Sequence, residues 1–251
     1  LISGPPGSGK TVMAFHRAEA LATKFDPVNV VMYNTVLSNF SNNASKKKEI
    51  QVKTMHSWFY KWGYKATRKK VKEIEPFKPD YKALFDLLLE KEVSESLDLE
   101  NLNWGHVVID EAQDFSTNKY EFLNKVRHTF FSAEDMPSVT VLADENQQLW
   151  DDNSSLKEIK NTFKIERGSN LFGLTKNYRN TDQINSLIEY FYVGLETGMT
   201  KPSGKQGELP ELVFSDNFAR TVKYIARYAK KYQNQEIVVI VPGNYHRGRY
   251  Y

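Results

Sequence analysis

Cysteine is absent from the 251 residues of this chain, which excludes disulfide bonds and thiolate metal sites. Long apolar runs are missing too: none approaches the roughly 18 residues that a membrane-spanning helix needs, and no signal peptide is visible. Charge of one sign is scarce, since 34 basic and 31 acidic residues leave a net charge of +3. That balance neither requires nor excludes a polyanionic partner. We expect a cytoplasmic protein with no membrane partner, although a chain that begins at Leu1 could have lost an upstream signal.

A phosphate-binding loop stands almost at the first residue. It consists of Gly4, Pro5, Pro6, Gly7, Ser8, Gly9, Lys10 and Thr11. Glycines let backbone N–H groups close around phosphate oxygens, and the helix expected next presents its positive N-terminus to the same anion. Lys10 is expected to reach the β- and γ-phosphates of ATP, and the Thr11 hydroxyl to ligate Mg²⁺. The loop therefore predicts ATP and Mg²⁺ as cofactors.

Short β-rich runs alternate with helical patterns along the chain, which predicts an α/β fold. Near-continuous apolar strands separated by helices favour a parallel sheet covered on both faces. Strands are expected at residues 1–3, 28–33, 50–53, 106–110, 139–143 and 236–241, with weaker candidates at 171–174 and 211–214. Helices are expected near residues 10–25, 55–62, 80–93, 117–131, 181–195 and 216–232.

A glycine- and lysine-containing stretch, residues 194–207, reads as a linker. We expect it to separate a first domain, residues 1–195, from a second part, residues 196–251. Two basic clusters, residues 46–48 and 68–72, flank the aromatic stretch 58–62. Charge runs of this kind are most often solvated surface, and the aromatic residues Trp58, Phe59, Tyr60 and Trp62 are expected mainly in the core.

A second motif complements the phosphate loop. The apolar triplet at 107–109 is followed at once by Asp110 and Glu111. A buried strand that ends in two acids places Asp110 at the carboxyl edge of the sheet, where it can complete the Mg²⁺ shell beside Thr11. Glu111 can then orient and deprotonate the attacking water.

The wording of residues 110–114, Asp-Glu-Ala-Gln-Asp, resembles motif II of superfamily 1 DNA helicases of the UvrD/Rep type. Further segments resemble that family's motifs in the same order, at residues 33–34, 54–58, 142–150 and 174–181. The resemblance implies a P-loop NTPase with a RecA-like parallel sheet flanked by helices. It also implies that residues 63–105 form a short inserted subdomain and that residues 196–251 hold only the beginning of a second RecA-like domain.

The resemblance also implies roles for individual residues. Gln147 would sense the γ-phosphate, and Gln113 would connect the ATP site to the motif that contains Gln147. Arg179 would neutralise charge on the transferring phosphoryl group, and Tyr178 would stack on the adenine. The expected catalytic set is Lys10, Glu111, Gln147 and Arg179.

Single-strand binders combine basic grooves with aromatic platforms. By position in the resembling motifs, the expected nucleic-acid residues are Tyr33, Asn34, Thr54, His56 and Trp150. His56 could equally be a structural histidine packed beside aromatic rings. Trp150 is the residue expected to couple the ATP state to the grip on a strand.

Three functional hypotheses follow. The first is an ATP-dependent DNA helicase or translocase motor whose ATP hydrolysis is stimulated by single-stranded DNA. This chain alone would hydrolyse ATP weakly. The second is a helicase-like ATPase switch that senses nucleic acid and regulates an attached or partner nuclease, as in bacterial defence. The third is an RNA helicase. The motor motifs do not separate them, because all three need ATP hydrolysis gated by nucleic acid.

Overall fold

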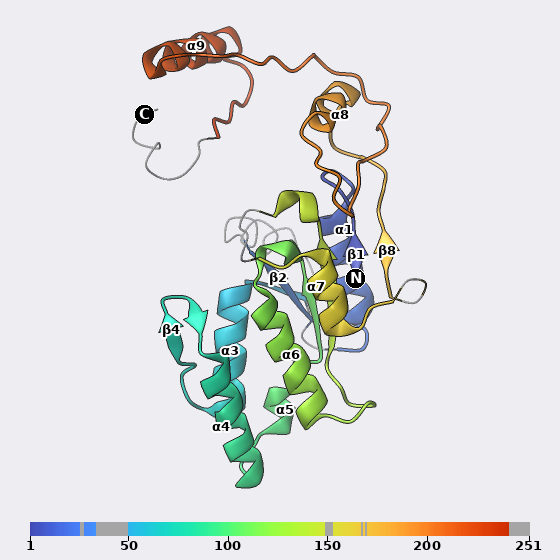
Figure 1. Ribbon diagram of the computed structural model, residues 1–251, viewed down its shortest axis with the longest axis vertical. Coiled ribbons are helices and arrows are strands. Elements are labelled where there is room, and N and C mark those ends of the chain that lie inside the picture. Colours follow the sequence, from blue (N-terminus) through green and yellow to red (C-terminus); the bar gives the residue numbers. More distant parts are fainter. Residues whose placement is uncertain (26–27, 34–49, 149–152, 167, 169, 241–251) are drawn as a thin grey trace. The chain divides into compact units, whose positions relative to one another are not determined.

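The structure is a computed structural model that describes residues 1–25, 28–33, 50–148, 153–166, 168 and 170–240 (Figure 1). The chain folds into two compact units. The first comprises Leu1–Glu208, and the second begins at Leu209. Asn34 and Trp150, both expected to bind nucleic acid, lie outside the described residues. Across the described residues, none of the helices combines the length and the apolar character that crossing a bilayer would require.

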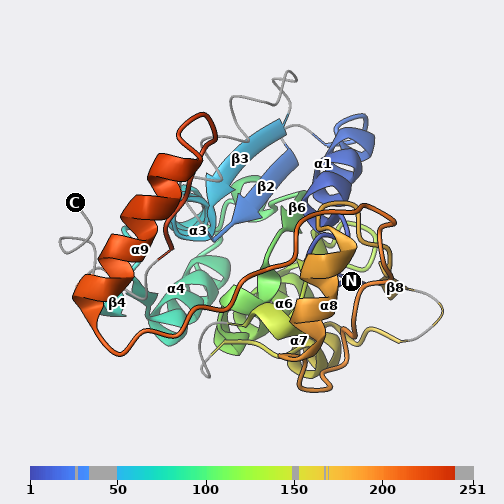
Figure 2. The same ribbon diagram turned by 90° about the horizontal axis from the view of Figure 1, so that it is seen from above.

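A six-stranded sheet forms the centre of the first unit. Its strands run in the order β3-β2-β6-β7-β1-β8, and every neighbouring pair is parallel. Seen from above, β3, β2 and β6 lie side by side (Figure 2). The bounds in that order are Ile50–Thr54, Val28–Met32, His106–Ile109, Ser138–Ala143, Ile2–Ser3 and Phe172–Gly173. The expected parallel α/β sheet is confirmed.

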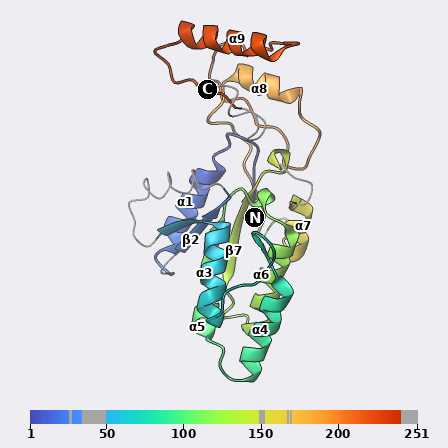
Figure 3. The ribbon, with the colours of Figure 1, turned by 90° about the vertical axis from the view of Figure 1, so that its left-hand side faces the viewer.

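Both faces of the sheet are covered, and the strands show why. Along β6, Val108 packs in the cluster that contains α1 (Lys10–Leu21), whereas Val107 and Ile109 pack in the opposite cluster. Successive strand residues point to opposite faces, so a continuous apolar triplet serves both layers. The second layer contains α3 (Met55–Thr67), α4 (Tyr81–Val93), α5 (Leu99–Leu102), α6 (Thr117–Phe130) and α7 (Leu156–Phe163). Figure 3 shows α1 on one side of the sheet and α3 and α6 on the other.

The aromatic stretch of α3 is mostly core, as expected. Trp58, Phe59 and Trp62 are buried, and Tyr60 is half-buried at the edge of that cluster. Helix α3 is longer than expected because the cap at Thr54 starts it and a left-handed residue, Arg68, ends it. A two-stranded antiparallel hairpin follows, β4 (Glu73–Glu75) and β5 (Lys78–Pro79), which the sequence pattern did not predict. The helices α5 and α7 were also not predicted.

The sheet brings the two predicted motifs to one edge. The register pairs Ser3 with Ala143 and Ile109 with Val141. The chain therefore leaves β1, β6 and β7 on the same carboxyl edge, where the phosphate loop, residues 110–114 and residues 144–148 follow. Ligands of open parallel sheets bind at this edge.

The expected linker belongs to the first unit. Lys201 N–H donates to the Thr175 carbonyl at 2.7 Å, and Gly207 N–H donates to Gln183 Oε1 at 2.9 Å. These bonds tie residues 196–207 to the segment around α8 (Asp182–Glu189), so the compact unit ends at Glu208 rather than near residue 195. The helix expected at 181–195 is correspondingly shorter and ends at Glu189.

The second unit contains α9 (Phe218–Lys231), close to the helix expected at 216–232. Two expected strands are wrong: residues 211–214 and the described part of 236–241 are not strands. A strand needs a hydrogen-bonded neighbour, and the described residues of this unit offer none. Whether this unit begins a second RecA-like domain stays a prediction.

Candidate active site and nucleic-acid interface

The phosphate loop, residues 4–11, connects β1 to α1 in a conformation that needs its glycines. Gly7 and Gly9 have φ of +78° and +91°, in the left-handed region that residues with a Cβ rarely adopt. Gly9 directly precedes α1, so the free N–H groups of the first helical turn lie next to the loop. The buried hydroxyl of Ser8 has no hydrogen-bond partner among the described residues. The loop thus offers unsatisfied donors at a helix N-terminus, which is the arrangement that receives phosphate.

Lys10 is 6% exposed and lies inside this loop. Its Nζ donates to the Gly4 carbonyl at 2.8 Å and to the Pro5 carbonyl at 3.4 Å, and it lies 3.4 Å from Asp144 Oδ2. Asp144, the residue that follows β7, is fully buried. The ammonium group is therefore held between the loop carbonyls and one carboxylate.

Asp110 directly follows β6, and its carboxylate is fully buried. Neither of its oxygens has a hydrogen-bond partner among the described residues. Burial, together with the neighbouring Glu111 carboxylate, raises the pKa of Asp110 to about 6, and Thr11 and Lys10 offset this only in part. A buried carboxylate without partners, near the Thr11 hydroxyl, is the donor set that Mg²⁺ uses when phosphates supply its other ligands. The residues present fit the metal.

Glu111 adopts φ of +50°, a strained value for a residue with a side chain. This conformation turns the chain sharply from β6 into a short 3-10 helix, Ala112–Asp114. Gln113, which is 1% exposed, donates through Nε2 to Glu111 Oε2 at 3.1 Å. Its Oε1 accepts the backbone N–H of Asp144 at 2.9 Å. Gln113 thus bridges the candidate base and the segment after β7.

That segment converges on the same carboxylate as Lys10. Gln147 Nε2 donates to Asp144 Oδ2 at 2.6 Å, and Asn146 N–H donates to Oδ1 at 3.1 Å. Two donors, Lys10 and Gln147, thus share one oxygen of Asp144. A contact chain runs from Lys10 through Asp144 and Gln113 to Glu111; we call it the relay.

The segment 177–180 packs against the phosphate loop. Tyr178 N–H donates to the Gly7 carbonyl at 2.8 Å, and Asn177 Oδ1 accepts the backbone N–H of Arg179 at 2.9 Å. A Cβ at Gly7 would lie 2.5 Å from Asn177 Oδ1 and 3.4 Å from Arg179 Cβ. Glycine at position 7 therefore serves a close approach as well as the backbone turn. Arg179 has its Cβ beside the loop and is exposed, and Tyr178 is 60% exposed.

Residues 1–239 match the protein family described as Schlafen group 3, DNA/RNA helicase domain. The chain belongs to this family. No curated protein matches the chain. The expectation of a helicase-type domain is thereby confirmed, whereas the narrower UvrD/Rep type stays a prediction.

This chain is similar to solved structures of Pif1 helicases. A structure of two coordinating Pif1 helicases that unwind forked double-stranded DNA shares 16% identity, with a TM-score of 0.38 over 75% of this chain and 42% of that one. Unliganded Pif1 from Bacteroides sp shares 18% identity, with a TM-score of 0.36 over 75% of this chain and 40% of that one. The ADP-AlF4 complex of Bacteroides sp Pif1 shares 18% identity, with a TM-score of 0.36 over 75% of this chain and 41% of that one. This chain thus spans about two fifths of the Pif1 chains, and values this low carry no residue-level comparison.

The expected nucleic-acid residues of the Schlafen domain follow two neighbouring strands. Tyr33 follows β2 and is 49% exposed, and Thr54 is the last residue of β3. The Thr54 hydroxyl accepts Ser57 N–H at 3.2 Å and so caps α3. His56 is exposed, and its ring centroid lies 4.1 Å from that of Tyr60. Within the described part of the chain, no hydrogen bond or ring contact joins Tyr33, Thr54 and His56 to one another.

Three residues were missed by reasoning from sequence. Asp144 and Asn177 connect the segments of the candidate site through the contacts above, and their positions inside the resembling motifs were the available signal. Phe77 lies at the turn of the β4–β5 hairpin with φ of +66° and 75% exposure. Its ring centroid is 5.1 Å from that of His56. Nothing in the local pattern marked it.

Proposed function

We propose that this Schlafen helicase domain is the ATP-hydrolysing motor region of a DNA helicase or translocase whose turnover is stimulated by single-stranded nucleic acid. The observation that carries the proposal is the relay from Lys10 through Asp144 and Gln113 to Glu111. A relay of this kind lets the residues that bind phosphate respond together with the candidate base.

The loop and Lys10 would bind the β- and γ-phosphates, and Tyr178 would stack on the adenine. Thr11 and Asp110 would hold Mg²⁺, which supplies positive charge to the phosphate oxygens when bound. Glu111 would accept the proton of the attacking water, and Gln147 would sense the γ-phosphate by leaving Asp144. Arg179 would neutralise charge that develops on the transferring group. The order of the motifs supports the UvrD/Rep type.

ATP hydrolysis by the intact protein, titrated with single-stranded DNA and with RNA of the same sequence, tests the proposal. We expect turnover that depends on Mg²⁺ and rises with one of the two strands. Turnover that neither strand changes would exclude a nucleic-acid-stimulated motor. Strand separation on a forked duplex distinguishes a helicase from a switch that regulates a partner nuclease, because a switch needs hydrolysis without unwinding.

The relay makes a prediction for Gln113. Gln113→Ala removes the acceptor for Asp144 N–H and the donor to Glu111. If Gln113 couples the two parts of the site, the ratio of strand-stimulated to basal turnover should fall about 5-fold or more, the low end of typical coupling energies. Gln113→Glu is the matched control, since it keeps an acceptor for Asp144 N–H but places a carboxylate against Glu111. A ratio unchanged in both variants would remove Gln113 from the coupling.

Phe77 makes a second prediction. Its exposed side chain lies beside His56 and follows the basic run 68–72 in the sequence, so it offers a stacking surface for a base. Phe77→Ala should weaken binding of a single strand by about 5- to 150-fold, the equivalent of one stacked base at 1 to 3 kcal/mol. Ile74→Ala is the control, because Ile74 is 68% exposed on the same hairpin but makes no ring contact. Equal affinities of both variants for the strand, measured by fluorescence anisotropy, would contradict the assignment.

A further inference from the structure

The short helix after β7, Glu145–Gln147, carries the candidate γ-phosphate sensor Gln147 at its last position. The backbone N–H groups of its second and third residues donate to Asp144, one to the carboxylate and one to the carbonyl. The N–H of Glu145, the first residue, donates at 3.1 Å to the hydroxyl of Thr197, 52 positions further along the chain. A half-buried side chain from a distant segment thus completes the hydrogen bonding of the helix that carries Gln147.

Two further contacts hold the neighbours of Thr197 in the same place. The Gly198 carbonyl accepts the side-chain amide of Asn146 at 3.2 Å, and Glu196 forms an ion pair with Lys160 on α7. Ion pairs that are partly exposed, as this one is, contribute little stability, so we assign the positioning to the two hydrogen bonds. The chain around Thr197 therefore lies along the short helix and is bonded to its backbone and to one of its side chains.

A few residues later, the same stretch of chain reaches the segment that contains Arg179. Lys201 N–H donates to the Thr175 carbonyl at 2.7 Å, and the Lys201 carbonyl accepts Asn177 N–H at 3.2 Å. The side chain of Asn177 in turn accepts the backbone N–H of Arg179 at 2.9 Å. Residues 196–201, which we call the strap, thus connect the helix of the candidate γ-phosphate sensor with the segment of the candidate arginine.

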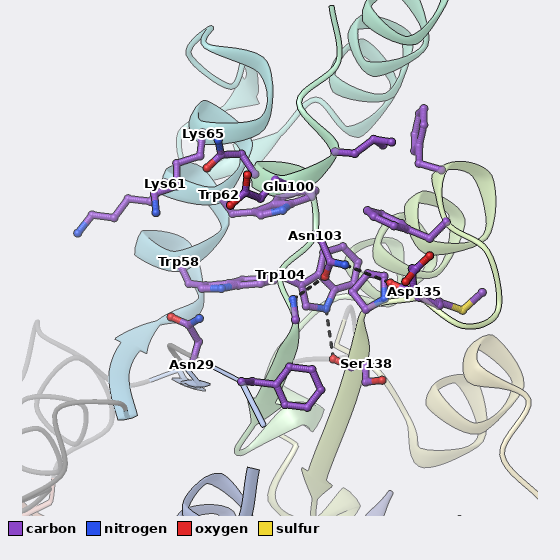
Figure 4. A pocket seen from close by; sticks show the side chains of 18 of the residues that line it. Asn29, Trp58, Lys61, Trp62, Lys65, Glu100, Asn103, Trp104, Asp135 and Ser138 are labelled. Carbon is purple, nitrogen blue, oxygen red and sulfur yellow. Dashed lines mark hydrogen bonds between the residues drawn. The ribbon is translucent and has the colours of Figure 1, made fainter. Parts of the chain in front are cut away.

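The amino edge of the sheet has a different character. A cavity of about 1160 Å³ lies there, lined by core side chains that are only 3 to 6% exposed, Trp58, Trp62 and Trp104 (Figure 4). Three lining lysines are matched by three lining carboxylates, and Glu100 lies beside Lys65 (Figure 4). Within the described residues, the lining includes neither the strap nor the segments that carry Gln147 and Arg179. The contacts that connect those two segments are therefore contacts of the carboxyl edge.

We propose that the strap positions Gln147 relative to Arg179 at the γ-phosphate, and that Thr197 is its positioning residue. The inference rests on the proposed ATP-hydrolysing function and adds a residue that lies outside the segments resembling helicase motifs. Gln147 donates to Asp144 in the structure, so it has to leave that carboxylate to reach a γ-phosphate. Thr197 holds the first residue of the helix while the last one changes partner, which limits where the Gln147 amide can go. Small displacements of such a group are costly in rate.

Thr197→Val tests the proposal, because valine has nearly the shape of threonine but accepts no hydrogen bond from Glu145 N–H. In the intact protein, we expect the strand-stimulated kcat to fall about 2- to 10-fold, the effect of one hydrogen bond, while the KM for ATP changes less than about twofold. Thr197→Ser keeps the hydroxyl and should keep the wild-type kcat. Thr23→Val is the matched control, since the exposed Thr23 hydroxyl donates to the Ala20 carbonyl of α1.

A second measurement needs no turnover. The melting temperature of the intact protein is compared with saturating Mg²⁺ and ADP and with saturating Mg²⁺ and a non-hydrolysable ATP analogue, so that the difference reports contacts to the γ-phosphate. We expect this difference to shrink in Thr197→Val and to persist in Thr197→Ser and Thr23→Val. Asn146→Ala removes the bond to the Gly198 carbonyl from the side of the helix and should shrink it too, which tests the strap even if Thr197→Val folds poorly.

The outcomes separate this proposal from the proposed function. A wild-type kcat and a wild-type γ-phosphate difference in Thr197→Val would overturn the role of Thr197, as would an equal loss in Thr197→Ser or Thr23→Val. A wild type that ADP and the analogue stabilise equally would overturn it as well. Turnover that no strand changes would refute the motor proposal, and the γ-phosphate difference would still decide whether the strap positions Gln147.

Discussion

ATP hydrolysis by the Lys10→Ala variant is expected to fall at least about 10²- to 10³-fold, the usual cost of removing one preorganised charged donor from a reacting centre. Lys10 is buried in the phosphate loop with its ammonium group among the Gly4 and Pro5 carbonyls. The measurement is steady-state phosphate release with a saturating strand. Wild-type turnover in this variant would remove the loop from the reaction.

The same substitution should also lower stability, because it leaves the fully buried Asp144 carboxylate without its cation. Gln147 and the Asn146 N–H still donate to Asp144, so we expect a loss of roughly 1 to 3 kcal/mol rather than that of an isolated buried charge. At about 2 to 4 °C per kcal/mol, the melting temperature should fall by several degrees.

A second substitution separates the two effects. In the double variant Lys10→Ala/Asp144→Asn the buried charge is gone, so the melting temperature should recover most of its loss while hydrolysis stays absent. A melting temperature that does not recover would show that Lys10 stabilises the loop through the Gly4 and Pro5 carbonyls instead. The single variant Asp144→Asn serves as the reference.

The sheet, and the edge at which the candidate ATP-site motifs meet, could be predicted from sequence because their signals are local. The triplet at 107–109 is apolar at every position, as a strand buried on both faces requires, and it ends directly at Asp110. Parallel strands place their carboxyl ends together, so the loop after β1 and the acids after β6 had to meet. The sequence pattern predicted which edge of the sheet holds these residues and which residue types meet there, but not the distances between them.

What could not be predicted depends on contacts between segments far apart in sequence. Lys10 and Asp144 are separated by 134 positions, and no local pattern pairs them. Residues 194–207 have the composition of a linker, yet their backbone is hydrogen-bonded to Thr175 and Gln183. The strands expected at 211–214 and in the described part of 236–241 have suitable residues, but a strand depends on a neighbouring strand, which propensity does not supply.

Asp110→Asn is expected to raise stability and abolish Mg²⁺-dependent hydrolysis at once. The folded carboxyl has its pKa raised from 3.8 to about 6, mainly by burial, so the fold favours its protonated form. Stability from this group is therefore complete below about pH 4 and is lost as the pH rises through 6. At neutral pH the ionised carboxylate therefore lowers the free energy of unfolding by roughly 3 kcal/mol. Asparagine has no charge and avoids this cost. Without nucleotide, the variant should melt several degrees above wild type at pH 7.5, and the difference should vanish toward pH 4.

The sign should reverse when ligand is present. Mg²⁺ with a non-hydrolysable ATP analogue should stabilise the wild type by mass action, because Asp110 then has a cation, and should stabilise Asp110→Asn much less. Asp114→Asn is the matched control: burial raises the pKa of Asp114 to about 6 as well, but this side chain is only half-buried. It should gain less stability and keep the response to Mg²⁺ and the analogue. If Asp110→Asn melts below wild type at pH 7.5, the buried carboxylate has a partner in the folded protein, and its assignment to Mg²⁺ fails. The ionised Asp110 carboxylate thus lowers the stability of the empty site, and bound Mg²⁺ removes that cost. The site therefore favours the nucleotide-bound state over the empty one.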